Sequence, residues 1–243
     1  MSSETCHITS AAWVTLMSAP AAAASKRLAR FIFDRPALYR LKRFFVEVVI
    51  WRVVLSGLCR LRPHPFPDLS CQYEGRHVLV AACGPGTLLT GPPISEKARV
   101  CAFDLSPHFV SACAQRRPDW RVYAGDVLHI PHRDRSFDVT VLYSVLHHVS
   151  ADAGVVLAEL ARVTASRIVV VEGVVPPVGW LRNALLAWYR VVDGGYRYYT
   201  RDQLLAAIQR LGLQVESEGL YGPIQHMWLG VLRRNGAAGG AGL

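Results

Sequence analysis

The residues that could do chemistry in this chain begin with a glycine turn. The stretch VLVAACGPGTLL starts as an apolar run and breaks at Gly84 and Gly86, which predicts a buried strand that feeds a tight turn. Such turns let the backbone of many α/β proteins approach a nucleotide. The dinucleotide pattern of three glycines is incomplete, and Pro92-Pro93 stands where the following helix should run. The loop therefore indicates a nucleotide site without identifying the nucleotide.

Two acidic residues follow the next strand-like segments. Asp104 ends the segment RVCAFD, and Asp126 ends RVYAGD. Ligands of open α/β sheets bind at the carboxyl ends of the strands, where a carboxylate can accept both hydroxyls of a ribose. Asp104 is therefore the candidate ribose ligand. The alternatives are a helix cap for Asp104 and a solvated turn acid for Asp126.

A histidine pair supplies the candidate base. His147 and His148 follow the apolar segment FDVTVLYS, and we expect them at the start of a helix that points toward the ligand. Imidazole is the side chain best suited to take a proton near neutral pH. Adjacent helical residues lie about 100° apart, so we expect one of the two to face the cleft. The alternative is that both are structural. His226, in an apolar strand, is a weaker candidate base.

Aromatic residues concentrate between residues 180 and 199. They could form an apolar pocket whose ring faces suit a cation, or each could equally belong to the core. They are Trp180, Trp188, Tyr189, Tyr196, Tyr198 and Tyr199.

These residues need a scaffold, and the apolar pattern predicts a parallel sheet. Strand-like runs alternate with helical segments from residue 76 onward, which is typical of a sheet covered on both faces. Ser106-Pro107 predicts a capped helix start, and Thr200 with Gln203 predicts a capping box. Two last strands around Gly222-Pro223 must be antiparallel neighbours. We therefore predict one α/β domain, a Rossmann-like three-layer α/β/α sandwich with a seven-stranded, mostly parallel sheet and an antiparallel last strand.

Composition is that of a globular chain. The 243 residues are 51% hydrophobic, and the six cysteines lack metal-ligand spacing, so we expect no metal site and no disulfide framework. The first residues lack the positive charge of a secretory signal. A reducing cytoplasmic location fits these observations best.

Nearly all of the excess positive charge lies in one segment. Residues 26–62 hold ten Lys and Arg against two acidic residues, although the whole chain carries a net charge of only +9. The nearly neutral remainder argues against nucleic acid as a partner. We predict a poorly ordered start at 1–25, a basic helical extension at 26–70 and a disordered tail at 235–243. The extension is a lid, a homodimer arm or a peripheral membrane contact through residues 26–62, and we favour the lid or arm.

The ordered set of motifs resembles a known family. The segments CGPG, AFDLSP, AGDVLHIPHRDRSFDVTVLYSVLHHV and LAELARV are similar to those of the class I S-adenosylmethionine-dependent methyltransferases. The likeness is to the small-molecule, type 11 branch that includes the ubiquinone and menaquinone methyltransferases. It covers about residues 75–234, which implies a methyltransferase domain at 71–234 with S-adenosylmethionine as cofactor. Val80 and Ala82 depart from the acid and the first glycine of the relatives.

The resemblance also implies residue roles. It implies that His148, more than His147, is the acceptor-side base, and that residues 176–199 form the acceptor lid. The implied cofactor ligands are Ala82, Cys83, Gly84, Gly86, Asp104, Leu105, Gly125, Asp126, Val127, Tyr143 and Ser144. The implied acceptor pocket consists of Trp180, Trp188, Tyr196, Tyr199 and His226.

The implied reaction needs alignment and few reactive groups. Methyl transfer from a sulfonium is an in-line displacement, and a hydroxyl acceptor also needs a base. We therefore expect O-methylation of a small lipophilic molecule, in natural-product biosynthesis. The alternatives are a cyclase or rearrangement enzyme that uses the same cofactor without methylation, and a binding or scaffold subunit.

Overall fold

The computed structural model describes residues 66–86, 94–175, 195–221 and 227–234, with residues 179, 183 and 186 between them. The predicted segments 1–25 and 235–243 lie outside the described residues. So do most of the extension at 26–70, most of the lid segment at 176–199, and Pro92-Pro93.

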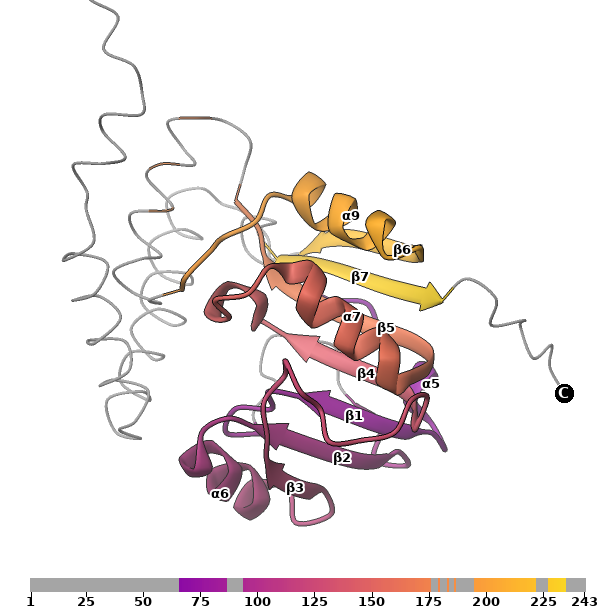
Figure 1. Ribbon diagram of the computed structural model, residues 1–243. Helices are drawn as coiled ribbons and strands as arrows, with labels where there is room; N and C mark the ends of the chain where they lie inside the picture. The colour runs from indigo at the N-terminus through magenta and orange to yellow at the C-terminus, as the bar shows by residue number, and fades with distance from the viewer. Residues whose placement is uncertain are drawn as a thin grey trace, which may run out of the picture.

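Within the described residues, seven strands form a single sheet in the order β3-β2-β1-β4-β5-β7-β6 (Figure 1). Neighbours from β3 to β5 are parallel, and β7 is antiparallel to both β5 and β6. The strands are β1 (His77–Ala81), β2 (Arg99–Asp104), β3 (Arg121–Ala124), β4 (Phe137–Tyr143), β5 (Thr164–Gly173), β6 (Leu213–Tyr221) and β7 (Met227–Arg234). The predicted fold class, with its antiparallel last strand, is confirmed.

The strand order creates the crevice that a ligand site needs. β1 pairs with β2 on one side and with β4 on the other. The chain therefore continues from β1 to β2 and β3 on one side of β1, and then crosses to β4 on the other side. Ala81, at the end of β1, lies opposite Phe103 of β2 and Leu142 of β4. The chain segments that follow these three strands therefore meet at one edge of the sheet, at the topological switch point.

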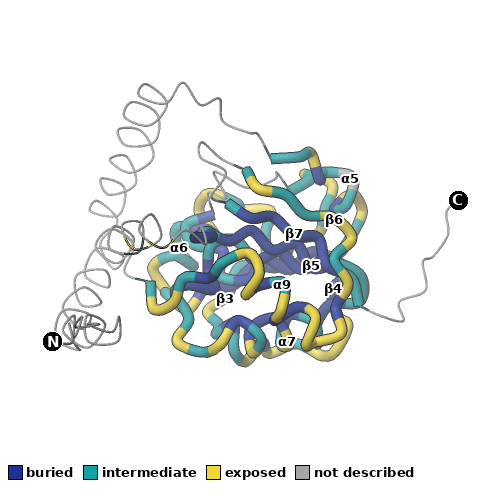
Figure 2. The backbone as a smooth tube through the Cα atoms, turned by 90° about the horizontal axis from the view of Figure 1, so that it is seen from above, coloured by how far each residue is buried: buried dark blue, intermediate teal, exposed yellow. Residues whose placement is uncertain are grey.

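Helices cover both faces of the sheet. They are α5 (Ser70–Tyr73), α6 (Pro107–Arg116), the 3₁₀ turn η2 (Leu146–His148), α7 (Ala153–Val163) and α9 (Arg201–Arg210). α7 and α9 lie together on one face in Figure 1, whereas buried side chains of α5 and α6 belong to the core of the other face. Figure 2 shows buried strands in the interior, with exposed residues on the outer side of α7 and α9.

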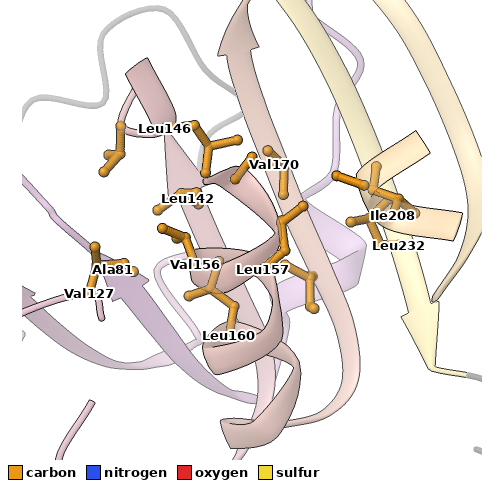
Figure 3. Close-up of a cluster of buried hydrophobic side chains, with 14 of the residues drawn as sticks. Ala81, Val127, Leu142, Leu146, Val156, Leu157, Leu160, Val170, Ile208 and Leu232 are labelled. Carbon is orange, nitrogen blue, oxygen red and sulfur yellow. The ribbon is translucent and has the colours of Figure 1, made fainter. Parts of the chain in front are cut away.

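Alternation along β1 serves both cores. Leu79 and Ala81 pack in the cluster under α7 and α9, while Val78 and Val80 pack in the cluster with α5 and α6. A strand buried on both faces reads as a continuous apolar run, which is why its sequence predicts a parallel sheet. In Figure 3 the apolar side of α7 meets side chains of β4, η2 and β5.

Helix starts follow the predicted caps. The Ser106 hydroxyl accepts from Phe109 N, with Pro107 at the first helical position of α6. Thr200 and Gln203 form the reciprocal capping box of α9. These caps satisfy backbone amides that a helix start leaves without intrahelical partners.

β5 begins at Thr164, directly after α7, and so starts before the apolar run RIVVVEGVV that a strand pattern in the sequence would pick out. The Thr164 hydroxyl donates to Leu160 O at 2.6 Å and lies 2.6 Å from the Thr140 hydroxyl of β4. A threonine that bonds both the helix end and the neighbouring strand makes a separate turn unnecessary.

Candidate functional site

The loop after β1 bends through left-handed backbone. Ala82, Gly84 and Gly86 have φ angles of 51°, 54° and 73°. Cys83 N between them donates to Phe103 O of β2 at 2.8 Å. For alanine this conformation is uncommon and costs energy, which is typical of backbone that is shaped for a site. The loop is therefore fixed to the end of β2 in an unusual conformation.

The two glycines of the loop have different surroundings. A Cβ added to Gly84 would meet nothing within 4 Å, whereas one on Gly86 would lie 2.9 Å from Cys113 Sγ of α6. Gly84 therefore borders open space into which a ligand can fit. Gly86 lets the loop approach α6 on its Cβ side, and its role as a cofactor ligand stays a prediction.

Asp104 ends β2 beside this loop. Its side chain accepts from Gly84 N and from Ser106 N, each at 2.9 Å, and the residue is 8% exposed. Burial raises the pKa of the Asp104 carboxyl, and the bonds from Ser106 and Gly84 partly offset that rise. The N-cap of α6 is Ser106, so Asp104 links the glycine loop to β2 and is not the helix cap.

An exposed apolar side chain follows the carboxylate. Leu105 is 72% exposed, which is unusual for a leucine beside a buried aspartate. Together, Gly84, Asp104 and Leu105 offer open space, a carboxylate and an apolar surface at the end of β2. These are the elements that a nucleoside needs, so the residues present fit the implied cofactor.

The loop after β3 adds a further wall. Gly125 N donates to Asp104 O at 3.0 Å, which ties the loop to the end of β2. One carboxylate oxygen of Asp126 accepts from Leu128 N at 2.9 Å in a local turn, and Val127 is buried. Asp126 is thus a turn aspartate in this structure, and a contact with adenine stays a prediction.

Two thiols near the loop, those of Cys83 and Cys101, are not activated for nucleophilic chemistry, whereas the hydrogen bond with Cys83 lowers the pKa of the Cys113 thiol. Cys83, Cys101 and Cys113 are buried free cysteines. The hydrogen bond with Cys113 and burial raise the pKa of the Cys83 thiol, and burial raises that of Cys101. A thiol with a raised pKa stays protonated and unreactive near neutral pH.

The chain leaves β4 by a sharp turn. Ser144 follows Tyr143 and has a φ of 56°, and Ser144 N donates to Val171 O of β5 at 2.7 Å. This left-handed residue redirects the chain into η2 over the end of β5. Tyr143 and Ser144 therefore lie at the predicted edge of the sheet.

The histidine pair lies in η2 and not at the start of a helix, which corrects the prediction. η2 spans three residues, and α7 begins only at Ala153. His147 is 4% exposed, and His148 is half-buried. Their ring centroids are 4.1 Å apart. The more enclosed member of the pair is thus His147, although the sequence favoured His148.

A carboxylate that sequence reasoning missed lies against His147. Glu172, near the end of β5, is fully buried and pairs with Nδ1 of His147. Its other oxygen accepts from Val145 N at 3.1 Å and Leu146 N at 2.8 Å. The available signal was an acidic residue inside the apolar run RIVVVEGVV, because buried charges need partners.

Residues 195–199 pass over η2. Tyr196 N donates to His147 O at 2.6 Å, and the Tyr198 ring stacks on the His147 ring at 5.4 Å. Arg197 forms an ion pair with Asp152 at 2.9 Å. This segment therefore holds His147 through a backbone hydrogen bond and a ring stack.

The predicted pocket aromatics have different positions. Tyr196 is 52% exposed, whereas Tyr199 is buried in the core cluster and its hydroxyl accepts from Ala153 N at 3.1 Å. Tyr199 thus fits the alternative interpretation of a core residue. Trp180, Trp188 and His226 lie outside the described residues.

Other features do not compete with this site. A cavity of about 520 Å³ lies near Arg162, Leu213 and Arg234, which places it where β6 begins and β7 ends, at the opposite edge of the sheet. Among the described residues, no three His, Cys, Asp or Glu side chains gather as metal ligands. The candidate site is therefore the edge that holds Gly84, Asp104 and His147.

Comparisons with known proteins point to one family. Residues 79–170 match the model of the family described as "Methyltransferase domain". The chain is 38% identical over 128 residues to a demethylmenaquinone methyltransferase of Beutenbergia cavernae and 36% identical over 124 residues to one of Thermobifida fusca. The first match covers 51% of this chain and 52% of the relative; the second covers 48% and 51%. The chain thus matches about half the length of these curated relatives.

Solved structures share the fold at low identity. An S-adenosylmethionine-dependent methyltransferase of Thermotoga maritima superposes with a TM-score of 0.57 at 15% identity and covers 84% of this chain and 99% of that one. Geranyl diphosphate C-methyltransferase of Streptomyces coelicolor, solved with geranyl diphosphate and S-adenosylhomocysteine, gives 0.52 at 14% identity and covers 66% and 73%. At these identities the likeness concerns the fold alone.

Proposed function

We propose that this chain, which belongs to the class I S-adenosylmethionine-dependent methyltransferases by its domain match and its fold, transfers a methyl group to a small lipophilic acceptor. The observation that carries the proposal is Asp104, a buried carboxylate bonded to the glycine loop at the end of β2. S-adenosylmethionine, when bound, supplies a methyl group on a sulfonium, whose neutral thioether is a good leaving group. The residues of the chain then have to bind the cofactor and the acceptor, align them and remove a proton from the acceptor.

Cofactor binding falls to three loops. The Asp104 carboxylate accepts hydrogen bonds from the two ribose hydroxyls, because a carboxylate at the end of β2 has an oxygen for each of these donors. Leu105 covers the adenine face, and Asp126 with Val127 binds the adenine edge. Open space at Gly84 receives the methionine part. Support for these roles comes from burial, loop geometry and strand position.

For the acceptor we propose a hydroxyl whose proton goes to a histidine of η2. The pair lies one turn beyond β4, beside the segment at 195–199, so a general base is available next to the cofactor loops. A lipophilic acceptor is supported by the relatives named for demethylmenaquinone. The setting we propose is natural-product biosynthesis in the cytoplasm, and the free thiols agree with a reducing compartment.

The basic segment at 26–62 completes the proposal as a lid over the acceptor. Its apolar stretch, residues 44–59, offers few polar groups, and such a wall suits a lipophilic ligand. In the part of the chain that the structure describes, no helix is long and apolar enough to span a membrane. The competing roles are a homodimer arm, in which the apolar residues pack on a second copy of the chain, and a membrane-surface helix, in which they contact lipid.

The test is methyl transfer by the full chain. It is incubated with S-adenosylmethionine carrying a labelled methyl group and with demethylmenaquinone, hydroxylated naphthoquinones and simple phenols, and product label and S-adenosylhomocysteine are measured by mass spectrometry. We expect label in an ether product and equal release of S-adenosylhomocysteine. Label on carbon would overturn O-methylation, turnover without S-adenosylhomocysteine would indicate the non-methylating alternative, and no calorimetric binding of either cofactor form would overturn the proposal.

A further inference from the structure

Glu172 is a buried charge with an unusual set of donors. Its side chain is fully buried near the end of β5, where an isolated carboxylate would be costly. The amides of Val145, Leu146 and Gly173 donate to it at 3.1, 2.8 and 3.2 Å, and Nδ1 of His147 faces it. The backbone donors explain how the chain tolerates the charge. They leave open why a histidine also faces it.

The pairing determines where the imidazole proton lies. A carboxylate only accepts, so a neutral His147 ring next to Glu172 carries its proton on Nδ1 and its basic lone pair on Nε2. When Nε2 takes a further proton, the same carboxylate stabilises the resulting imidazolium. A carboxylate behind a histidine therefore selects the tautomer that can act as a base and increases its basicity.

The ring is also fixed in direction. Tyr198 stacks on it with an interplanar angle of 15°, and Tyr196 N binds the main-chain carbonyl of His147 at 2.6 Å. His148 also makes a tilted ring contact with His147, with the centroids 4.1 Å apart. Groups that catalyse proton transfer need this restraint, because misplacement of about 1 Å lowers rates strongly. His147 has both the restraint and the carboxylate.

We infer that Glu172 is a positioning residue that makes His147, and not His148, the base that takes the proton of an acidic phenol or enol acceptor. The inference rests on the proposed function. In the step, the acceptor O–H bond breaks, its proton joins Nε2 of His147, and its electron pair stays on oxygen as the nucleophile. The imidazolium then returns the proton to solvent after turnover. Glu172 keeps its charge throughout.

The inference limits the acceptor. An imidazole with an ordinary pKa of about 6.5 can deprotonate a phenol, whose pKa is near 10, when both are aligned. An aliphatic alcohol has an acidity close to that of water, with a pKa near 16, so the equilibrium would be far less favourable. We therefore expect His147-dependent turnover with phenols and naphthols and none with aliphatic alcohols.

Glu172→Gln in the full chain separates positioning from simple capping of η2. Glutamine keeps the length of the side chain and an oxygen for the amides of Val145 and Leu146, but its NH₂ group would donate to Nδ1. We expect the His147 proton to move from Nδ1 in the parent to Nε2 in the variant, as measured by ¹⁵N NMR of the ring nitrogens. Glu216→Gln is the matched control, because Glu216 pairs with Arg167 on the far part of the sheet.

Kinetics with 1-naphthol, whose hydroxyl keeps its proton near neutral pH as a phenol does, add readouts that a structural role would not change selectively. We expect kcat of Glu172→Gln to fall about 100-fold, the scale of general base catalysis, with KM and the S-adenosylhomocysteine Kd within threefold. In the part of the chain that the structure describes, the ionisable groups in contact with His147 include Glu172, His148 and Tyr198. Loss of the anion lowers the basicity of the ring, so the acid limb of kcat should move to lower pH. His147→Gln should lose at least tenfold more activity than His148→Gln.

Several outcomes would overturn the inference. A parent protein with its His147 proton on Nε2, which needs no variant to measure, would do so. So would a Glu172→Gln variant that loses stability and cofactor affinity together with kcat, since that is the pattern of a cap alone. If no acceptor is turned over at all, the proposed function fails, while the position of the ring proton still decides whether Glu172 sets the tautomer.

Discussion

Asp104 shows how a single residue can be poorly suited to folding and well suited to binding. Burial raises the pKa of its carboxyl despite two backbone hydrogen bonds. A raised pKa means that the charged form is less stable in the folded chain than in the unfolded one, so Asp104 destabilises the fold near neutral pH. A chain that keeps such a charge at the end of a strand does so for a ligand with matching donors.

We predict that Asp104→Asn weakens cofactor binding and leaves folding intact. The amide keeps one oxygen for Gly84 N, but its NH₂ group cannot accept from Ser106 N. It also loses the charge that strengthens bonds to ribose hydroxyls, so S-adenosylhomocysteine should bind about 30-fold more weakly, or about 2 kcal/mol. The thermal midpoint should change little, because removal of a costly buried charge offsets the lost bond to Ser106. Calorimetry and thermal unfolding measure the two effects, with Asp119→Asn, an exposed loop change, as control. Equal affinity in both variants would exclude Asp104 from the cofactor site.

The same carboxyl predicts a pH dependence of cofactor binding. Protonation removes one acceptor, so affinity is fully present above the raised pKa of Asp104 and is lost as pH falls through it. The loss should therefore begin at a higher pH than the ordinary aspartate range near 4. Calorimetric titrations at a series of pH values should show this decline in the parent chain and a flat profile in Asp104→Asn. A decline of the same shape in the variant would assign it to another group.

At this scale the sequence predicts residues whose position along a strand sets their role. Gly84 and Asp104 follow buried strands, so the edge of the sheet brings them together. Glu172 was missed because it lies within a strand, and only the neighbouring η2 turn explains its charge. The choice between His147 and His148 depends on backbone geometry after Ser144, whose left-handed φ of 56° leaves no signal in the sequence.

Among the elements, the loop after β1 gives a contrast between two glycines. Both have positive φ, so alanine at either position costs about 1 to 2 kcal/mol in backbone strain. At Gly86 the added Cβ would also lie 2.9 Å from Cys113 Sγ and 3.2 Å from its Cα, whereas at Gly84 it would meet no atom within 4 Å. The loop is thus packed on α6 at one glycine and open at the other.

We therefore predict a larger loss of stability for Gly86→Ala than for Gly84→Ala. The free energy of unfolding should fall by about 1 kcal/mol in Gly84→Ala and by about 3 kcal/mol in Gly86→Ala, because the second variant adds a clash with backbone that cannot move freely. Urea denaturation of both variants measures this difference. Equal losses would mean that the loop does not pack on α6 as described.

Elements were predictable where burial or capping determined them. β1 and β4 are rich in buried apolar residues, and α9 has its capping box in the sequence. η2 was not predictable, because its three residues have no periodicity, and its amides are satisfied by Glu172 from another strand. The early start of β5 has the same origin, since Thr164 bonds a neighbouring strand and the end of α7.

Across the whole molecule, alternation of strands and helices predicts a doubly covered parallel sheet, but it does not predict the strand order. The order β3-β2-β1-β4-β5-β7-β6 depends on long-range pairing, which local patterns do not determine. The antiparallel placement of β7 between β5 and β6 follows from its short connection to β6 and from its apolar residues, which are buried in both cores.

The uneven distribution of charge along the chain also concerns the whole molecule. Residues 26–62 carry ten of the 27 basic residues and two of the 18 acidic ones. A basic, apolar segment binds anionic lipid by about 1 kcal/mol per nearby Lys or Arg, with further gain from buried apolar area. A lid or dimer arm uses the same apolar residues against protein and leaves the arginines in water. We favour the lid, because globular proteins rarely leave so much apolar surface uncovered.

Deletion of residues 1–62 distinguishes the two roles, because each ties the apolar face to a different partner. If the segment covers the acceptor, the intact chain should not sediment with vesicles of phosphatidylserine and phosphatidylcholine, and the shortened chain should aggregate or lose acceptor turnover. A membrane role requires the reverse: the intact chain sediments in a salt-sensitive way, and the shortened chain stays folded, binds S-adenosylhomocysteine and no longer sediments. Molecular mass by light scattering of the intact chain separates a dimer arm from a lid, since an arm that packs on a second copy doubles the mass and a lid on its own domain does not.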